Sequence, residues 1–264
     1  MSKQSKAALR YLRHRISVRS VYDLHSPFAY RVYADILKDD TIYPQFRSIE
    51  KVRSRLLKDT GYLKMSDLGA GAGETPWCHR LIPVKKVIKN SCVKPQYGRF
   101  LFRLAKNFHP EVMVELGTSL GISTSYLALG NPKGQITTIE GCQETANAAR
   151  RNFEHLGLAN VRQLTGSFDE VLPGLLQELG NVDLFFIDGN HRKKPSLQYF
   201  HQCLQHINDG SVLILDDIHW SEEMEEAWKE IREHASVTMT IDLFRMGLVF
   251  FKKGLSKEDF ILHF

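Results

Sequence analysis

The chain of 264 residues lacks the features that would place it in several special classes of protein. It has no run of about 18 apolar residues, so no membrane-spanning helix is predicted. Its N-terminus is basic but lacks the apolar stretch of a secretory signal. Cysteine is scarce, and Cys78, Cys92, Cys142 and Cys203 form no CxxC pair, which argues against a zinc site or a redox motif. We therefore expect a cytoplasmic protein with reduced thiols.

Acidic residues are rare in the first part of the chain. Residues 1–110 hold 22 Lys/Arg and 8 Asp/Glu, a net charge of +14, whereas residues 111–264 hold 13 and 22, a net charge of −9. The first twenty residues contain six basic residues and no acid. Such a segment can meet nucleic acid, an acidic substrate or a membrane surface, or it can be a solvated helix that complements the acidic C-terminal part.

From residue 111 onward, segments typical of strands alternate with segments typical of helices. This order predicts an α/β fold of the Rossmann-like kind, with a mostly parallel seven-stranded sheet and a C-terminal antiparallel hairpin. Ligands of such sheets bind at the carboxyl ends of the strands. The expected strands are 112–117, 135–140, 160–166, 182–188, 211–217, 237–244 and 247–253, and the expected helices are 123–130, 145–157, 169–180, 195–207 and 221–234.

The first 95 residues are less regular. Residues 4–18 and 27–58 are predicted to be helical, with a break at His25, Ser26 and Pro27. We interpret residues 1–95 as a basic, mainly helical extension that could cover the active site, and residues 96–264 as the cofactor-binding domain.

Two glycine-rich segments compete for the role of a nucleotide-binding loop. DLGAGAG (67–73) matches the pattern well, but no acid follows it in residues 85–95 to bind ribose hydroxyls. ELGTSLG (115–121) is a looser match, yet a strand precedes it, a helix follows it, and Glu140 ends the next strand. We favour 115–121, because Gly117 and Gly121 let the backbone approach a ligand and the helix N-terminus can bind a carboxylate.

Acidic residues also end two later strands. Asp188 follows one apolar strand, and Asp216 and Asp217 follow the next. Three oxygen ligands without a thiolate suit Mg²⁺ better than zinc. His191 lies just past Asp188 and could act as a general base. The alternative is that these residues are strand-end caps and a surface histidine.

These residues together carry a family resemblance. Residues 111–253 resemble class I S-adenosylmethionine-dependent methyltransferases, and ELGTSLGIST is similar to the first motif of the metal-dependent catechol type. That type has a lysine where this chain has His191, and the DxxH and DD pattern is similar to that of macrolide-sugar O-methyltransferases.

The resemblance implies a role for each matching position. Glu115, Gly117, Ser119 and Gly121 would surround the methionine portion of S-adenosylmethionine, and Glu140 would bind its ribose. Ser167 and Phe168 would border the adenine, and Asp188 would serve both the cofactor and Mg²⁺. It implies Mg²⁺-dependent O-methylation of a small hydroxylated molecule. The alternatives that remain open are an RNA methyltransferase that uses the basic N-terminal region, and a non-catalytic nucleotide-binding module.

Overall fold

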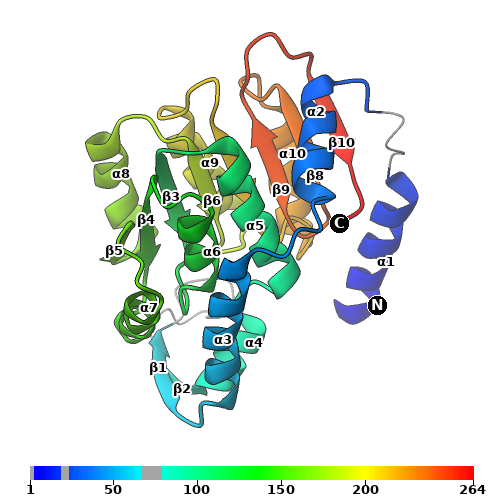
Figure 1. Cartoon of the computed structure of the whole chain (residues 1–264). Coiled ribbons are helices and arrows are strands. Elements are labelled where there is room, and N and C mark those ends of the chain that lie inside the picture. The colour runs from blue at the N-terminus through cyan, green and yellow to red at the C-terminus, as the bar shows by residue number, and fades with distance from the viewer. Residues whose placement is uncertain (1–2, 19–23, 67–78) are drawn as a thin grey trace. The chain divides into compact units, whose positions relative to one another are not determined.

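The fold is taken from a computed structural model that describes residues 3–18, 24–66 and 79–264 (Figure 1). The chain divides into two compact units. One unit comprises residues 38–179, and the other combines residues 1–37 with residues 180–264. In the part of the chain that is described, no helix is both long enough and apolar enough to cross a membrane.

The unit of residues 38–179 contains a parallel sheet in the order β3-β4-β5. Its strands are short, and β3 and β4 are buried nearly throughout, as expected for parallel strands covered by helices. The strands are β3 (Val112–Leu116), β4 (Gln135–Glu140) and β5 (Val161–Thr165), and the helices that pack on them are α6 (Ile122–Gly130), α7 (Gln143–Leu156) and α8 (Phe168–Leu179).

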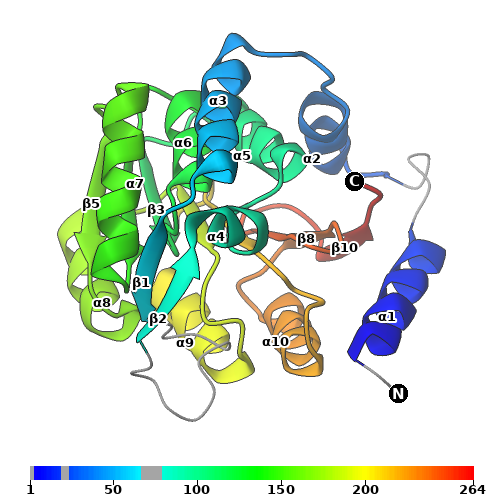
Figure 2. The same cartoon turned by 90° about the horizontal axis from the view of Figure 1, so that it is seen from below.

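Helices and a small hairpin precede this sheet in the same unit. Strands β1 (Tyr62–Ser66) and β2 (His79–Pro83) pair antiparallel, which the sequence analysis did not predict. Helix α3 (Pro44–Lys58) lies beside the short helix α4 (Val84–Asn90), as Figure 2 shows. Helix α5 (Pro95–Phe108) packs closely on α6.

The other unit contains the remaining strands, in the order β10-β8-β9-β7-β6. Strands β6 and β7 are parallel, whereas β9 runs antiparallel to both β7 and β8, so the predicted closing hairpin is confirmed. Strand β10 adds a parallel edge to β8 and was not predicted. The strands are β6 (Leu184–Ile187), β7 (Val212–Leu215), β8 (Met239–Asp242), β9 (Gly247–Phe250) and β10 (Glu258–Ile261).

The helices of this unit come from both ends of the chain. Helix α10 (Glu222–Glu233) packs on α9 (Lys193–Leu204), and the Ser221 hydroxyl caps α10 by accepting a hydrogen bond from the Met224 N–H at 3.1 Å. From the N-terminal part come α1 (Lys3–Ser17), α2 (Pro27–Val32) and the π-helix η2 (Tyr33–Leu37).

The prediction of one continuous helix over residues 27–58 is therefore wrong. Regular helix stops at Leu37 and resumes at Pro44, because Tyr43 precedes a proline and is held in an extended conformation. The seven strands expected from residue 111 onward are all present as β3 to β9, so the mostly parallel α/β fold is confirmed.

Candidate functional site

The loop between β3 and α6 turns through three left-handed residues. The backbone φ angle is 104° at Gly117, 48° at Ser119 and 76° at Gly121. At Gly121 a side chain would also collide with the ring of Phe153, since a Cβ built there lies 2.4 Å from the ring. Gly121 provides no side-chain cap for α6, so the helix N-terminus can offer its N–H groups to an anion.

Glu140 ends β4 and is joined directly to this loop. Its Oε2 accepts a hydrogen bond from the Ser119 N–H at 2.8 Å, and its Oε1 accepts one from the Cys142 N–H at 3.0 Å. A carboxylate oxygen has two lone pairs, so each oxygen can accept a second hydrogen bond from a ribose hydroxyl. Two backbone amides therefore fix the orientation of the predicted ribose-binding residue.

Glu115 lies deeper than Glu140 and is completely buried. Its Oε2 accepts hydrogen bonds from the hydroxyls of Thr124 and Thr138, the latter at 2.6 Å. Burial raises the pKa of Glu115 to about 7; the neighbouring hydroxyls lower this pKa, and the charge of Glu140 raises it further. Glu115 thus joins β3, β4 and α6, and its contact with a cofactor stays a prediction.

Ser167 and Phe168 lie where β5 leads into α8. The Gly166 N–H donates to the Glu140 carbonyl oxygen at 3.0 Å, which places this turn beside the end of β4. The competing DLGAGAG segment (67–73) lies outside the described residues. The structure therefore brings together the predicted residues of this half, which we call the cofactor half: Glu115, Gly117, Ser119, Gly121, Glu140, Ser167 and Phe168.

The second half of the predicted site lies in the other unit, at the ends of β6 and β7. These parallel strands end side by side, and the Asp216 N–H donates to the Ile187 carbonyl oxygen at 2.9 Å. The Nε2 atom of His191 lies 3.6 Å from Asp188 Oδ1 and 4.0 Å from Asp217 Oδ2. The structure therefore gathers the predicted base and the predicted acids into one cluster, which we call the acidic half.

Arg245 is a member of this cluster that the sequence analysis missed. Its guanidinium holds both oxygens of the buried Asp216, with Nη2 2.7 Å from Oδ2 and Nε 3.0 Å from Oδ1, and it lies 3.6 Å from Asp217. Burial raises the pKa of Asp217 and the charge of Asp216 adds to this effect, while Arg245 and His191 oppose it. Because β9 pairs antiparallel with β7, a residue just before Gly247 must lie near the end of β7. Arg245 could have been predicted from this pairing of the strands.

The three acids do not form a metal-binding cluster in this arrangement. Within the described ranges no group of three histidine, cysteine or carboxylate side chains is disposed to hold a metal ion. Both oxygens of Asp216 accept hydrogen bonds from Arg245. The positive charge of Arg245 already offsets the repulsion between Asp216 and Asp217, and it would repel a metal cation bound beside it. The side chains therefore do not fit Mg²⁺ as they stand.

A second buried charge cluster supports the loop after Asp217. Asp242 accepts a hydrogen bond from Trp228 Nε1 at 3.1 Å and lies 2.8 Å from His219 Nε2 and 3.0 Å from His14 Nε2. Burial alone would raise the pKa of Asp242, but the hydrogen bonds of the two histidines outweigh it and lower this pKa. For His219 burial acts in the opposite direction and lowers the pKa. The pairing with Asp242 and Glu225 outweighs burial, so the pKa of His219 is raised overall.

This cluster also joins α1 to the loop of Trp220. Arg10 lies 3.3 Å from the Glu225 carboxylate and donates to the Trp220 carbonyl oxygen at 3.3 Å. The Trp220 ring is half exposed, with its centroid 6.2 Å from that of His191. Part of the basic N-terminal charge therefore pairs with acids of the same unit, as the solvated-helix alternative predicted.

Known methyltransferases are similar to part of this chain. Residues 114–218 match the family described as "Methyltransferase domain". The chain is 34% identical over 129 residues to a catechol O-methyltransferase of Niastella koreensis, covering 48% of this chain and 58% of that protein. It is 33% identical over 128 residues to a catechol O-methyltransferase of Mycobacterium tuberculosis, covering 48% and 56%. The chain thus spans little more than half the length of these relatives.

Solved structures support the fold. The chain is similar to a methyltransferase of Podospora anserina bound to SAH, with a TM-score of 0.61 and 17% identity, covering 89% of this chain and 100% of that one. It is also similar to the O-methyltransferase of Bacillus cereus in complex with SAH, with a TM-score of 0.56 and 18% identity, covering 88% and 100%. The chain therefore has the α/β fold of these methyltransferase structures, and its residues 114–218 are similar to the family described as "Methyltransferase domain".

Proposed function

We propose that the protein transfers a methyl group from S-adenosylmethionine to a hydroxyl oxygen of a small molecule. The observation that carries the proposal is the loop of residues 115–121, fixed to Glu140 by the hydrogen bond from the Ser119 N–H. The similarity over 129 residues to a catechol O-methyltransferase supports a hydroxylated acceptor. We further propose residues 96–264 as the catalytic domain and residues 1–95 as an extension.

The residues of the cofactor half fit S-adenosylmethionine in their chemistry. Glu140 is already oriented and keeps acceptor capacity for ribose hydroxyls. The uncapped N-terminus of α6 suits the carboxylate of an amino-acid group. When bound, S-adenosylmethionine supplies a methyl group on a positively charged sulfonium.

His191 is the residue that we propose to accept the proton of the acceptor hydroxyl. A positioned base of this kind typically contributes ~10²–10⁴-fold to the rate. The carboxylates of Asp188 and Asp217 lie within 4.0 Å of Nε2 and would stabilise the imidazolium that forms. Trp220 and the 218–224 loop would then contact the acceptor.

The sequence also predicts a role for Mg²⁺, which none of the steps proposed above requires. Arg245 occupies the carboxylate of Asp216, so a cation would have to displace a buried ion pair. Asp188, Asp216 and Asp217 could bind Mg²⁺ only after that rearrangement. A thermal-unfolding titration decides the question: a midpoint that rises with Mg²⁺ in the wild type, but not in Asp216→Asn/Asp217→Asn, would establish the metal.

The decisive experiment measures cofactor binding and transfer separately. Calorimetry should show binding of S-adenosylmethionine, and incubation with labelled cofactor and a panel of catechols and other hydroxylated metabolites should show methyl ethers by mass spectrometry. Each acceptor is tested with Mg²⁺ and with chelator. A protein that binds no S-adenosylmethionine would refute the proposal, and one that binds it but methylates only RNA would replace the acceptor class.

A further inference from the structure

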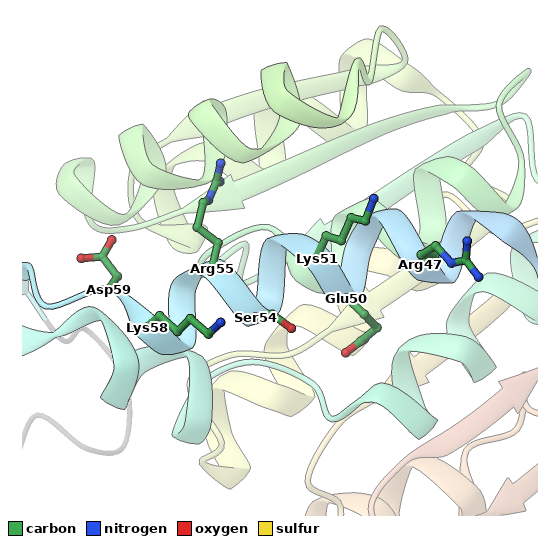
Figure 3. A pocket seen from close by; sticks show the side chains of 7 residues that line it. All are labelled: Arg47, Glu50, Lys51, Ser54, Arg55, Lys58 and Asp59. Atoms are coloured by element: carbon green, nitrogen blue, oxygen red, sulfur yellow. The ribbon is translucent and has the colours of Figure 1, made fainter.

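A groove runs along α3, in the unit of residues 38–179. Its volume is about 760 Å³. Figure 3 shows that its lining side chains all come from α3 and from the residue just after it. They are Arg47, Glu50, Lys51, Ser54, Arg55, Lys58 and Asp59. The groove therefore presents four cationic side chains and two carboxylates along a single helix.

The carboxylates of the groove already have partners, and three of its cations do not. Glu50 accepts a hydrogen bond from the Tyr126 hydroxyl at 2.6 Å, and Asp59 accepts one from the Gly61 N–H at 2.7 Å. Across the described residues, no carboxylate lies within salt-bridge distance of Arg47, Lys51 or Lys58. Four cations against two carboxylates leave the groove a formal net charge of +2, and three of its cations have no ion-pair partner among the described residues.

Arg55 is held in place by a buried residue of α7. Its Nη2 donates to the side-chain oxygen of Asn152 at 2.7 Å, and the Asn152 amide donates to the Leu120 carbonyl oxygen at 2.9 Å. Asn152 is buried, whereas Arg55 is exposed. One cation of the groove is thus fixed before any ligand arrives, and it is linked through Asn152 to the loop of residues 115–121.

The spacing of the cations weakens the helix that carries them. Arg47, Lys51 and Arg55 follow one another at four-residue intervals, and like charges at that spacing on a helix destabilise it slightly. Charges that alternate in sign are typical of a solvated helix face with ion pairs, whereas this row of three cations contains no acid. The neighbouring helix α4 adds the exposed Lys85, Lys86 and Lys89 without an acid. A bound anion would relieve the repulsion that this arrangement creates.

We propose that this groove binds a small molecule that carries two or three phosphate groups. The groove is open to solvent, and its volume is large enough to hold a molecule of this size. Arginine can grip a phosphate with two parallel hydrogen bonds, and lysine adds a point charge. Figure 3 shows Lys51 and Arg55 pointing to one side of α3 and Glu50 to the other, so a compact anion can meet both cations and avoid the carboxylate.

The test uses the full chain and inorganic tripolyphosphate as the probe, in calorimetry at about 0.15 M salt, where exposed charges are screened beyond about 8 Å. The wild type should bind with measurable heat. Lys51→Gln combined with Arg55→Gln should weaken binding at least about tenfold, since hydrogen bonds to charged groups are lost. Lys133→Gln, at an exposed lysine of the same unit outside the groove, should bind as the wild type does. Circular dichroism confirms that each variant is folded.

Three results would overturn the proposal. They are no binding to the wild type, equal binding in the double variant, or an equal loss in Lys133→Gln. Single-stranded RNA that binds while tripolyphosphate does not, with a steep dependence on salt, would assign the surface to nucleic acid instead. None of these measurements depends on methyl transfer, so the groove and the proposed activity can fail independently.

Discussion

The cofactor half and the acidic half of the candidate site are built by different means. In the cofactor half, backbone amides do most of the positioning: the N–H groups of Ser119 and Cys142 hold Glu140, and three left-handed residues shape the loop. In the acidic half, charged side chains hold one another, as Arg245 holds Asp216. The second charge cluster of the same unit is built in the same way, with His219 and His14 paired to Asp242.

The difference explains how each half responds to change. A backbone cradle depends on a few consecutive residues and on glycine at Gly121, so its motif is local in the sequence. A buried charge network depends on residues far apart in the chain, and removal of one partner leaves another charge buried and unpaired. We therefore expect substitutions in the acidic half to cost stability, and those at Glu140 to cost cofactor affinity.

The largest expected effect is on the network around Asp242. Asp242→Asn removes the charge that His219 and His14 meet, and should lower the free energy of unfolding by about 3–5 kcal/mol in urea titrations. The difference in unfolding free energy between the wild type and this variant should become smaller as pH rises through the raised pKa of His219, because the imidazolium then loses its proton and its attraction to Asp242. Glu233→Gln is the control, because its exposed pair with Lys229 at 3.9 Å should be worth under about 1 kcal/mol. Equal small losses would show that the network is not structural.

Glu115 should make the cofactor half sensitive to pH in the opposite sense from a typical salt bridge. Its pKa is about 7 when folded, above its ordinary value of 4.5, so folding favours the protonated form. Stability should therefore fall as pH rises from about 4.5 through about 7, by roughly 3 kcal/mol in total. Relative to Glu115→Gln, the wild type should lose stability between pH 5 and pH 8 in denaturant titrations. A constant difference between the two proteins would mean that the carboxyl group titrates normally.

His191 should separate chemistry from binding. His191→Ala should slow turnover by ~10²-fold or more, which corresponds to about 2.7 kcal/mol, and should leave the affinity for S-adenosylmethionine unchanged. His155→Ala, at an exposed position on α7, should keep full turnover. Wild-type turnover in His191→Ala would assign the base elsewhere.

Glu140 should show the smallest of these effects, and only on the cofactor. Glu140→Ala should weaken the binding of S-adenosylmethionine by ~1.5–3 kcal/mol, the usual range for hydrogen bonds to a charged group. Part of the loss would come from the loop, because the Ser119 N–H loses its acceptor. Calorimetry measures the change, and Glu144→Ala on the exposed first turn of α7 serves as control. Unchanged affinity in Glu140→Ala would place the ribose elsewhere.

Periodicity predicted most elements from residue 111 onward because their signals are local. Apolar runs marked β3, β6 and β7, and Gly157 marked the end of α7 in the left-handed conformation that favours glycine. The N-terminal part gave weaker signals. The β1–β2 hairpin and the break between Leu37 and Pro44 were missed because short strands in a basic, irregular segment have no clear period.

The sequence by itself determined the fold class, the glycine loop and the strand-end acids, because each depends on neighbours in the chain. Only the tertiary structure decided which side chains form ion pairs and hydrogen bonds with those acids. Arg245 reaches Asp216 through the antiparallel register of β9 on β7, and His14 reaches Asp242 across most of the chain length. Pairings of this kind depend on which strands and helices become neighbours, and a single sequence encodes that choice only through the energy of the whole packed core.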